Sequence, residues 1–268
     1  MSTTSDSMRI TVFGSRGSCA VSGRDYLEFG GNTSCYLVEA AGQAIILDGG
    51  TGLMGVPVDF ANPVAILLSH LHTDHIAGFG MYGRLSQKGH TTDIFVPAKD
   101  DEEAASLVSL YYAPPLWPLK LADYGGDVAF HAMPASFDIG EVHVETAEGN
   151  HPGGCVLMRL TYGGKSLVYA TDYEQNDEAD DRLVELARGT DLLLYDGQYE
   201  EGADYAAHRG FGHSTPQAGI AIQKRSGAKR LLVVHHDPRC TDDMLRERER
   251  TLERPDVQFA REGMVIEL

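Results

Sequence analysis

The residues best suited to chemistry lie in one short stretch, 70–75, with the sequence HLHTDH. Its three imidazoles and one carboxylate are ligands of the kind that bind a borderline cation such as Zn²⁺. His70 and His72 are two residues apart and Asp74 is adjacent to His75, so the spacing indicates pairs of ligands and two metal ions. A polar surface loop or a set of hydrogen-bonded core histidines are the alternatives, and this density of ligands disfavours both.

Further candidate ligands follow apolar runs elsewhere in the chain. The runs 166–170, 191–195 and 230–234 are each apolar in character and each stop at polar residues. Short runs of this kind are typical of buried strands, and a rigid strand end can aim a side chain at a shared point. The residues that follow these runs are Asp172, Asp196, and the pair His235 and His236. His151, in a turn-rich loop after the apolar residues 142–144, completes the set.

The order of these residues resembles the metal site of the metallo-β-lactamase superfamily. The pattern H-x-H-x-D-H is followed by a single His, then by an Asp after an apolar strand, then by a His that ends a late strand. The resemblance covers nearly the whole chain from about Arg9 onward. It implies one metal bound by His70, His72 and His151, a second bound by Asp74, His75 and His235, and a bridge between the two supplied by Asp172.

Within this superfamily the chain looks most similar to the phosphodiesterase branch, which includes tRNA 3′-processing endonuclease (tRNase Z) and the cyclic-phosphate phosphodiesterase of phosphonate breakdown. Three motifs carry this similarity: GGNTSC at 30–35, ILDGGTG at 46–52 and GHST at 212–215. The last motif resembles the His-Ser-Thr with which tRNase Z donates a proton. It implies His213 as general acid, Asp196 as the carboxylate that orients it, and His235 in place of His236 as the ligand.

These residues predict hydrolysis of a small phosphodiester or cyclic phosphate. Two divalent ions would hold a bridging hydroxide, because coordination lowers the pKa of water to about 7. Zn²⁺ suits the ligands best, and Mn²⁺ or Fe²⁺ can occupy the same ligand types. Asp74 is placed to hold the proton of the nucleophile, and His213 to protonate the leaving alkoxide.

Other functions could use the same residues. A lactone or thioester hydrolase of the same fold would need no strong acid and would favour an apolar acyl pocket. A metal-bearing sensor without enzymatic activity would be expected to lose a ligand or the acid, and this chain keeps all of them. An oxygen-reducing diiron site is disfavoured, because that branch carries a carboxylate where His72 stands.

Charge separates a small substrate from a nucleic acid. The 268 residues include 39 acidic and 22 basic side chains, for a net charge of −17. Nucleic-acid binding requires Lys and Arg to neutralise phosphates, and the segment 197–211 is too short for the long arm that tRNase Z enzymes often use. We therefore expect a small phosphodiester as the partner and a tRNase Z-like nuclease as the less favoured alternative. No membrane partner is expected, because no apolar run approaches the length of a bilayer. A homodimer is possible.

The fold expected from this resemblance is an α/β structure of the αββα type, with two mixed β-sheets face to face and helices outside. A hydrophobic content of 43% supports one compact domain over residues 9–268, after a disordered tail over residues 1–8 that has no signal-peptide character. Four scattered cysteines without a C-x-x-C pair fit reduced thiols and a cytoplasmic location. Strands are expected at 9–13, 33–39 and 43–47, and helices at 100–111, 177–188, 216–225 and 241–254.

Four features near the site have a supporting or open role. Asp48 ends a strand and is expected to fix the loop 70–75 without binding metal. The segment 14–18 lacks a Walker lysine and a following helix, so we expect it at the rim of the site. His208 is a candidate substrate contact. The segment 111–118, which contains the only Trp, is either a rigid crossover on the core or a substrate-facing lid.

Overall fold

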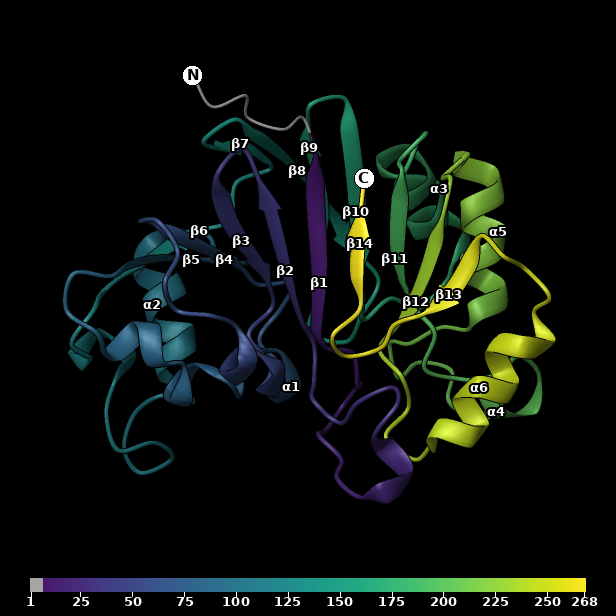
Figure 1. Cartoon of the computed structure of the whole chain (residues 1–268), viewed down its shortest axis with the longest axis horizontal. Coiled ribbons are helices and arrows are strands. Elements are labelled where there is room, and N and C mark those ends of the chain that lie inside the picture. The colour runs from purple at the N-terminus through teal and green to yellow at the C-terminus, as the bar shows by residue number, and fades with distance from the viewer. Residues whose placement is uncertain (1–6) are drawn as a thin grey trace.

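Two seven-stranded sheets face each other at the centre of the protein (Figure 1). The structure is a computed structural model that describes residues 7–268. In order across the first sheet the strands are β14 (Val265–Glu267), β1 (Met8–Gly14), β2 (Cys35–Ala40), β3 (Gln43–Leu47), β4 (Val64–Leu67), β5 (Thr91–Val96) and β6 (Asp127–Ala132). In order across the second they are β13 (Val257–Phe259), β12 (Leu231–Val234), β11 (Leu192–Asp196), β10 (Lys165–Ala170), β9 (Cys155–Tyr162), β8 (Val142–Gly149) and β7 (Ser136–Ile139).

Both sheets are mixed in the same way, with an antiparallel half and a parallel half. In the first sheet the pairing is antiparallel from β14 to β3 and parallel from β3 to β6. In the second sheet it is antiparallel from β7 to β10 and parallel from β10 to β13. Because the carboxyl ends of neighbouring parallel strands share one edge, the residues that follow β3 and β4, and those that follow β10, β11 and β12, are brought together.

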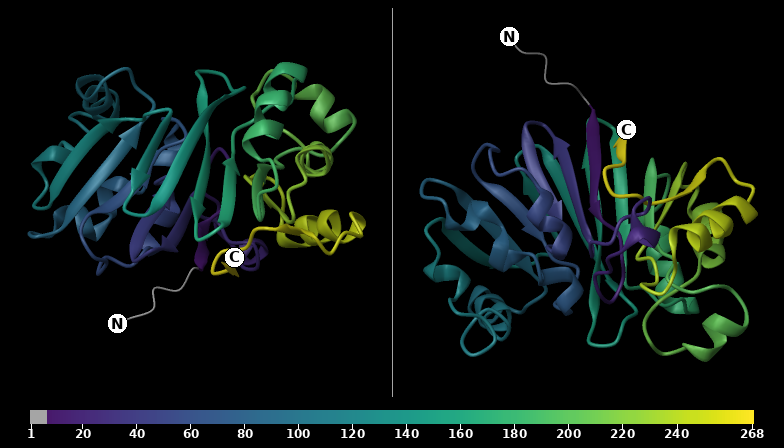
Figure 2. Two further views of the ribbon diagram at one scale, coloured as in Figure 1. Left: turned by 90° about the horizontal axis from the view of Figure 1, so that it is seen from above. Right: turned by 60° about the horizontal axis from the view of Figure 1, so that its bottom comes forward.

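Helices cover the outer face of each sheet, as the two further views make plain (Figure 2). α2 (Asp101–Ser109) packs on the first sheet, and α3 (Asp177–Leu186), α5 (Pro216–Ser226) and α6 (Asp242–Thr251) pack on the second. The short helices α1 (Thr73–Ile76) and α4 (Ala203–Ala207) lie in loops. Five 3₁₀ turns complete the described elements: η1 (Arg24–Tyr26), η2 (Thr51–Gly55), η3 (Phe79–Met81), η4 (Gly83–Ser86) and η5 (Leu121–Asp123). The expected αββα arrangement is confirmed.

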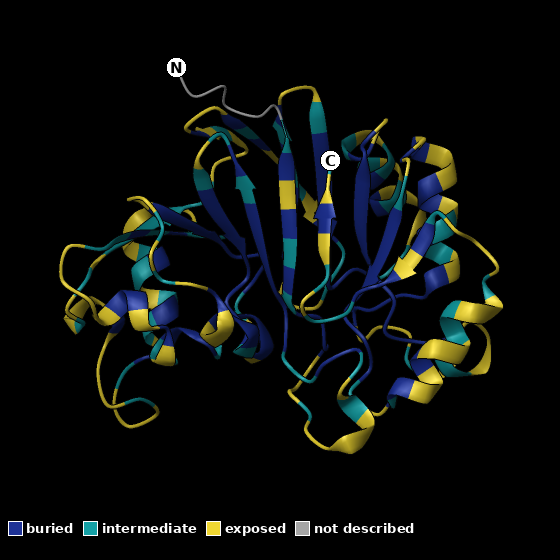
Figure 3. Cartoon of the chain, in the orientation of Figure 1, coloured by how far each residue is buried: buried dark blue, intermediate teal, exposed yellow. Residues whose placement is uncertain are grey.

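The core has three layers, and they explain the apolar runs in the sequence. In β10, Leu167 and Tyr169 point between the sheets, whereas Val168 and Ala170 point toward the helices. A strand that is buried on both faces must be apolar at every position, so it shows a continuous run and no alternation. Figure 3 shows β11 and β12 buried along their length, whereas β1 and β14 and the outer faces of the helices have exposed positions.

Each of the four longer helices begins at a side chain that caps its first turn. Asp100, Asn176, Thr215 and Thr241 each accept a hydrogen bond from the backbone N–H three residues later. Such caps satisfy amide groups that have no partner within the helix. α5 also has Pro216 in its first turn and ends at Gly227, which adopts a left-handed conformation.

The observed boundaries differ from the predicted ones by a few residues. Helices α2, α3 and α6 end two or three residues earlier than expected. At the end of each one a backbone N–H bonds to a nearer carbonyl than in a regular α-helix, so the last turn is not α-helical. At the N-terminus the prediction was wrong for Met8, which is buried as the first residue of β1 and pairs with Ala40. Residues 1–6 of the expected tail lie outside the described residues.

The segment 111–118 packs its aromatic residues onto the core of the first sheet. Tyr112 is fully buried and its hydroxyl donates to the carbonyl of Ile76 at 2.6 Å. The indole N–H of Trp117 donates to the hydroxyl of Tyr124 at 2.7 Å, and its ring packs edge-on against Tyr112. These contacts correspond to the rigid crossover. Neither of the two cavities at the metal site is lined by Tyr111, Tyr112 or Trp117.

Two further observations concern membrane-spanning helices and the cysteines. No helix in the described part of the chain is both long and apolar enough to span a membrane. All four cysteines lie among the described residues, and none is bonded to another. The cytoplasmic location stays a prediction.

Candidate metal centre

The seven candidate ligands come together at one edge of the two sheets. The first sheet contributes the segment after β4 and helix α1, with His70, His72, Asp74 and His75. The second sheet contributes the loop between β8 and β9, the end of β10 and the end of β12, with His151, Asp172 and His235. Ligand atoms from these residues form two groups, and within each group all the atoms lie within 4.8 Å of one another.

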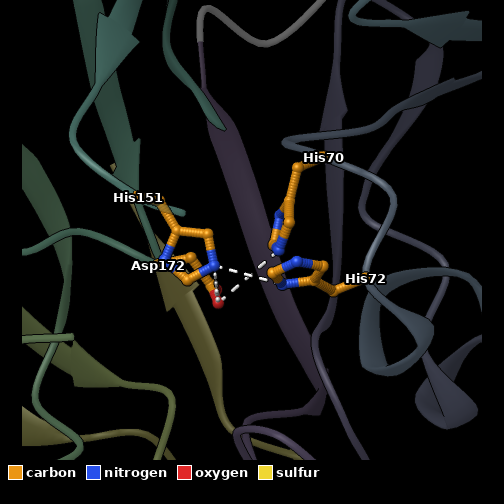
Figure 4. Close-up of side chains that lie close together, drawn as sticks. All are labelled: His70, His72, His151 and Asp172. Carbon is orange, nitrogen blue, oxygen red and sulfur yellow. Dashed lines mark hydrogen bonds and ion pairs between the residues drawn. The ribbon is translucent and has the colours of Figure 1, made fainter. Parts of the chain in front are cut away.

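The first group consists of three imidazoles and one carboxylate oxygen (Figure 4). Nε2 of His70 and Nε2 of His151 each lie 3.7 Å from Oδ1 of Asp172. Nε2 of His151 is 3.1 Å from Nδ1 of His72. The four side chains point toward a common point between them.

The second group uses the other oxygen of the same carboxylate. Oδ2 of Asp172 lies 3.0 Å from Nε2 of His75 and 3.1 Å from Nε2 of His235. Oδ2 of Asp74 lies 3.2 Å and 3.3 Å from the same two nitrogens. Asp172 therefore presents one oxygen to each group, which is the geometry that a bridging ligand requires.

The donor set fits divalent metal ions. Nε2 of His70 and Nε2 of His75 are buried and have no hydrogen-bond partner, although both point at carboxylate oxygens. A buried polar atom without a partner is costly, and a cation placed among these atoms would remove that cost. Burial lowers the pKa of His70 well below its usual value, so this imidazole stays neutral, which is the form that binds metal.

Opposite charges hold the second group together. Burial alone would lower the pKa of His235, but the carboxylates Asp172 and Asp74 outweigh it and raise this pKa to about 9. Burial opposes ionisation of Asp74, whereas the imidazoles of His75 and His235 favour it. The net effect lowers the pKa of the Asp74 carboxyl. A divalent ion must compete here with protons on imidazole, and it would take their place between the same carboxylates.

The outer nitrogens of two ligand imidazoles are fixed by other groups. Nδ1 of His75 lies 2.7 Å from Oδ2 of Asp48, and Nδ1 of His151 lies 2.8 Å from the carbonyl oxygen of Gly212. Asp48 also accepts hydrogen bonds from Ser69 and from the hydroxyl of Tyr169. A partner on one ring nitrogen sets the tautomer and leaves the other nitrogen free for a metal. As expected, Asp48 supports the loop 70–75 and lies outside both groups of ligands.

His213 and Asp196 form a buried pair beside the second group. Nδ1 of His213 lies 2.9 Å from Oδ2 of Asp196, and the same oxygen is 3.6 Å from Nδ1 of His235. The other oxygen of Asp196 accepts N–H groups from Gln198 and Ser214. Asp196 is therefore engaged through both oxygens at its strand end, and it orients His213.

Two other histidines lie near the site and are not part of it. Nε2 of His236 contacts the carbonyl oxygen of Ala260 at 2.9 Å, and burial lowers the pKa of this imidazole to about 3. The neutral ring packs in the core, so the choice of His235 as the candidate ligand fits the geometry. His208 stacks on Tyr199 at 4.5 Å, and Tyr199 packs edge-on against His213, so a substrate contact at His208 stays a prediction.

The segment 14–18 lies at the rim of the site, as expected, and its contacts are ones that the sequence does not reveal. The backbone N–H of Ser18 donates to Oδ2 of Asp74 at 2.8 Å. Gly17 donates its N–H to the carbonyl of His236, and a side chain at Gly17 would overlap the imidazole of His235. The segment, which continues from β1 of the first sheet, thus contacts two ligands of the second group, Asp74 and His235.

Three residues at strand ends adopt a backbone conformation that is rare for non-glycine residues. Asp48, Asp172 and His235 have φ angles of 59°, 51° and 59°. Left-handed backbone at a residue with a Cβ is unfavourable and tends to occur where function requires a particular side-chain direction. Each turn directs its side chain back into the site. Asp and His adopt this conformation more often than most residues with a Cβ, but the residue type alone does not locate it in the sequence.

Comparison with known proteins defines the class of protein. The family model described as "Beta-lactamase superfamily domain" matches residues 43–236, which is most of the chain. The chain therefore belongs to the metallo-β-lactamase superfamily. Together with the two His/Asp groups, this membership identifies a metallo-hydrolase of the metallo-β-lactamase fold.

Individual relatives are similar over most of their length. The chain is 26% identical over 272 residues to the "Probable metallo-hydrolase YhfI" of Bacillus subtilis (strain 168), which covers 97% of this chain and 100% of that protein. The crystal structure of YhfI matches with a TM-score of 0.74 and 25% identity, over 98% of this chain and 100% of that one. A "Ribonuclease Z" from Ignicoccus hospitalis is 26% identical over 250 residues, 76% of this chain and 82% of that protein. A solved diphosphatase from the PhnP family shares the fold, with a TM-score of 0.70 at 18% identity over 97% of this chain and 98% of that one.

Proposed function

We propose that the chain is a binuclear metal-dependent phosphodiesterase that hydrolyses a small phosphodiester or a cyclic phosphate. The observation that carries the proposal is the position of His213. It lines a cavity of about 380 Å³ together with Asp74, Asp172, Ser18 and Thr73, and we call this the polar cavity. An imidazole whose Nδ1 is held by Asp196 directs its Nε2 away from that carboxylate, where it can give a proton to a leaving alkoxide.

The two His/Asp groups would hold the metals. His70, His72 and His151 would bind one ion, Asp74, His75 and His235 the other, and Asp172 both. Bound divalent ions would neutralise charge on the phosphoryl oxygens and lower the pKa of water. Mixed imidazole and carboxylate ligands suit Zn²⁺ best, with Mn²⁺ and Fe²⁺ as the alternatives.

The side chains of the polar cavity account for the movement of protons. Asp74 accepts the Ser18 N–H at Oδ2, and among the described residues its Oδ1 has no partner, so Oδ1 can hold a proton of the attacking water. A new P–O bond forms from the water oxygen while the P–O bond to the alcohol breaks. His213 transfers a proton to the departing oxygen, and the products are a phosphomonoester and an alcohol.

A lactone or thioester hydrolase is the second candidate function, and one observation favours it. A cavity of about 390 Å³ beside His72 is lined by Leu71, Pro97, Leu107, Cys155 and Val156, and we call this the apolar cavity. An acyl chain would fit such a surface. The oriented acid at His213 supports the phosphodiester, because an alkoxide on phosphorus is a poor leaving group without a proton.

Net charge supports a small substrate over a nucleic acid. With 39 acidic and 22 basic side chains, the chain has few cations to place against a phosphate backbone. The similarity to a ribonuclease Z therefore supports a shared type of chemistry on a smaller substrate.

Initial rates on three substrates separate the candidates. We expect the zinc-loaded protein to hydrolyse bis-p-nitrophenyl phosphate faster than an acyl-lactone or an acyl-thioester at equal concentration. Faster turnover of either acyl compound would replace the phosphodiesterase proposal with the acyl hydrolase.

The leaving group tests the role of His213. His213→Ala should lower turnover of an alkyl phosphodiester by about 10²- to 10⁴-fold, the usual contribution of positioned proton transfer. With p-nitrophenolate, which departs without a proton, the loss should be much smaller. His143→Ala, at a partly exposed histidine paired with Asp138, is the control and should change neither rate. Equal losses on both substrates, or loss of metal from His213→Ala, would show that His213 is not the acid.

A further inference from the structure

The polar and apolar cavities lie on the two sides of one short segment. Leu71 and His72 line both of them, so the cavities meet at the residues that carry the first metal group. The two linings differ in kind. The polar cavity has two carboxylates and the acid His213, whereas no Asp, Glu, Lys or Arg lines the apolar cavity.

The apolar cavity is assembled from four separate parts of the chain. Leu107 comes from α2, Pro97 follows β5, Leu71 follows β4, and Cys155 and Val156 begin β9. Gly153 and Gly154 form part of its wall without side chains, which leaves room next to His72. A concave surface of this size and character binds a hydrophobic group of a ligand.

The position of the acid decides which part of a substrate enters which cavity. The alkoxide that leaves must lie within hydrogen-bond reach of His213, and His213 lines only the polar cavity. The leaving alcohol therefore occupies the polar cavity. The substituent that stays on phosphorus must go elsewhere, and the apolar cavity is the space that adjoins the same His72.

We propose, building on the phosphodiesterase function above, that the apolar cavity binds the retained substituent and that the substrate is a mixed phosphodiester. One ester group is an alkyl or aryl group that remains on phosphorus, and the other is a polar alcohol that leaves. Water supplies the new P–O oxygen, the P–O bond to the polar alcohol breaks, and that alcohol takes its proton from His213. The product is a phosphomonoester of the hydrophobic alcohol.

A series of substrates with one leaving group tests this assignment. Methyl, butyl and hexyl p-nitrophenyl phosphate all release p-nitrophenolate and differ only in the retained chain. Burial of each methylene strengthens binding about threefold to fourfold. We expect kcat/KM of the zinc-loaded protein to rise at least tenfold from methyl to hexyl, mainly through KM. A ratio near one would overturn the proposal.

Variants on α2 show whether the gain comes from this cavity. Leu107→Asp should reduce the hexyl-to-methyl ratio of kcat/KM to near one, and the milder Leu107→Ala should reduce it in part. Leu110→Asp is the matched control, because Leu110 is 70% exposed at the end of the same helix and does not line the cavity, and it should keep the full ratio. A ratio that survives both substitutions of Leu107 would rule the cavity out.

Binding measurements separate failure of this proposal from failure of the phosphodiesterase function. Hexyl phosphate should bind the zinc-loaded protein at least tenfold more tightly than methyl phosphate by calorimetry, and Leu107→Asp should remove the difference. Binding of this kind without turnover of any diester would support the cavity and reject the phosphodiesterase. Equal binding of the two phosphates would reject the cavity whatever the activity.

Discussion

Within residues 7–268, Asp172 is the one side chain that belongs to both candidate metal groups. Its Oδ1 faces the imidazoles of His70 and His151, and its Oδ2 faces those of His75 and His235. The carboxylate is buried, and Thr171 donates a hydrogen bond to Oδ2 at 2.8 Å. A side chain with one oxygen in each group couples the two sites, so its loss should affect both.

Asp172→Ala should therefore remove at least one of the two metals expected per chain. His72→Ala should lower the metal content per chain less than Asp172→Ala does, because it removes a ligand from the first group alone. Elemental analysis of the purified variants is the measurement. Asp191→Asn is the control, since Asp191 lies at the start of β11, at the opposite end from the site, and pairs with Lys229. Two metals retained in both variants would contradict the ligand assignment.

At the residue scale the sequence predicted positions better than contacts. Residues 70–75 and the polar residues that end apolar runs supplied the candidates, and the superfamily resemblance selected from them the seven side chains that the two groups contain. The roles of Ser18 and Ser69 were not predictable. Ser18 bonds to Asp74 through its backbone N–H, which every residue except proline has, so its residue type carries no signal. Ser69 bonds to Asp48 through both its N–H and its hydroxyl, but a serine hydroxyl has many potential partners and the sequence does not say which one it meets.

At the scale of elements, the segment 14–18 organises the second metal group. It continues from β1 of the first sheet and makes two backbone hydrogen bonds with His236. The N–H of His236 donates to the carbonyl of Ser15, and the N–H of Gly17 donates to the carbonyl of His236. This pairing holds the end of β12 against the first sheet. The segment therefore fixes His235, which lies in the second sheet, relative to Asp74, which lies in α1.

Gly17→Ala should disrupt this arrangement. The added Cβ would overlap the imidazole of His235 and the side-chain oxygen of Gln198, and both residues are buried, so the ligand must shift. We expect the variant to keep the metal of the first group and lose that of the second, as read by elemental analysis. Gly83→Ala is the control, because a Cβ there meets Val58 at an ordinary distance of 3.6 Å. Full metal content in Gly17→Ala would show that the close approach has no influence on the site.

Arg16, within the same segment, anchors it to two other loops. Its guanidinium is fully buried and donates to the carbonyls of Gly30 and Cys240 at 2.7 Å each, and to that of Asp237 at 3.3 Å. Asp242 lies 3.8 Å away. One side chain thus joins the segment that precedes β2 to the loop that follows His235.

Arg16→Met should lower the free energy of unfolding by about 3–5 kcal/mol, because it leaves buried carbonyls without donors. Urea unfolding followed by circular dichroism measures this change. Arg9→Met is the control, since Arg9 makes an exposed ion pair with Glu267 and its loss should have little effect. Equal stability of Arg16→Met and the unmodified protein would show that the buried guanidinium is not an anchor.

Among the strands, those buried on both faces give the plainest signal in the sequence. β10, β11 and β12 appear in the sequence as continuous apolar runs because each lies between the inner core and a helix layer. β6 and β7 lie at sheet edges with most of their residues partly exposed, and their sequences show no comparable run. Strands of this kind acquire their structure from their neighbours, so the sequence alone does not reveal them.

For the whole molecule, the metal site joins the two sheets. One set of candidate ligands follows β4 of the first sheet, and the other set follows strands of the second. Neither sheet could form the site alone, and this arrangement follows from the pairing of parallel strands in each sheet. The sandwich could be expected from the superfamily resemblance, whereas the contacts between the sheets depend on packing across many residues.

The net charge of −17 is the other property of the whole molecule that bears on function. Two bound dications would offset only four of these charges. Binding of nucleic acid depends on the release of counterions by Lys and Arg, so binding of mixed tRNA should be weaker than about 1 µM at physiological salt. Fluorescence anisotropy with labelled tRNA is the measurement, and p-nitrophenyl phosphodiesters assayed in parallel show that the same preparation is active. Submicromolar binding, or efficient trimming of a tRNA precursor, would favour the tRNase Z-like alternative, because a locally basic surface would then have to exist despite the overall charge.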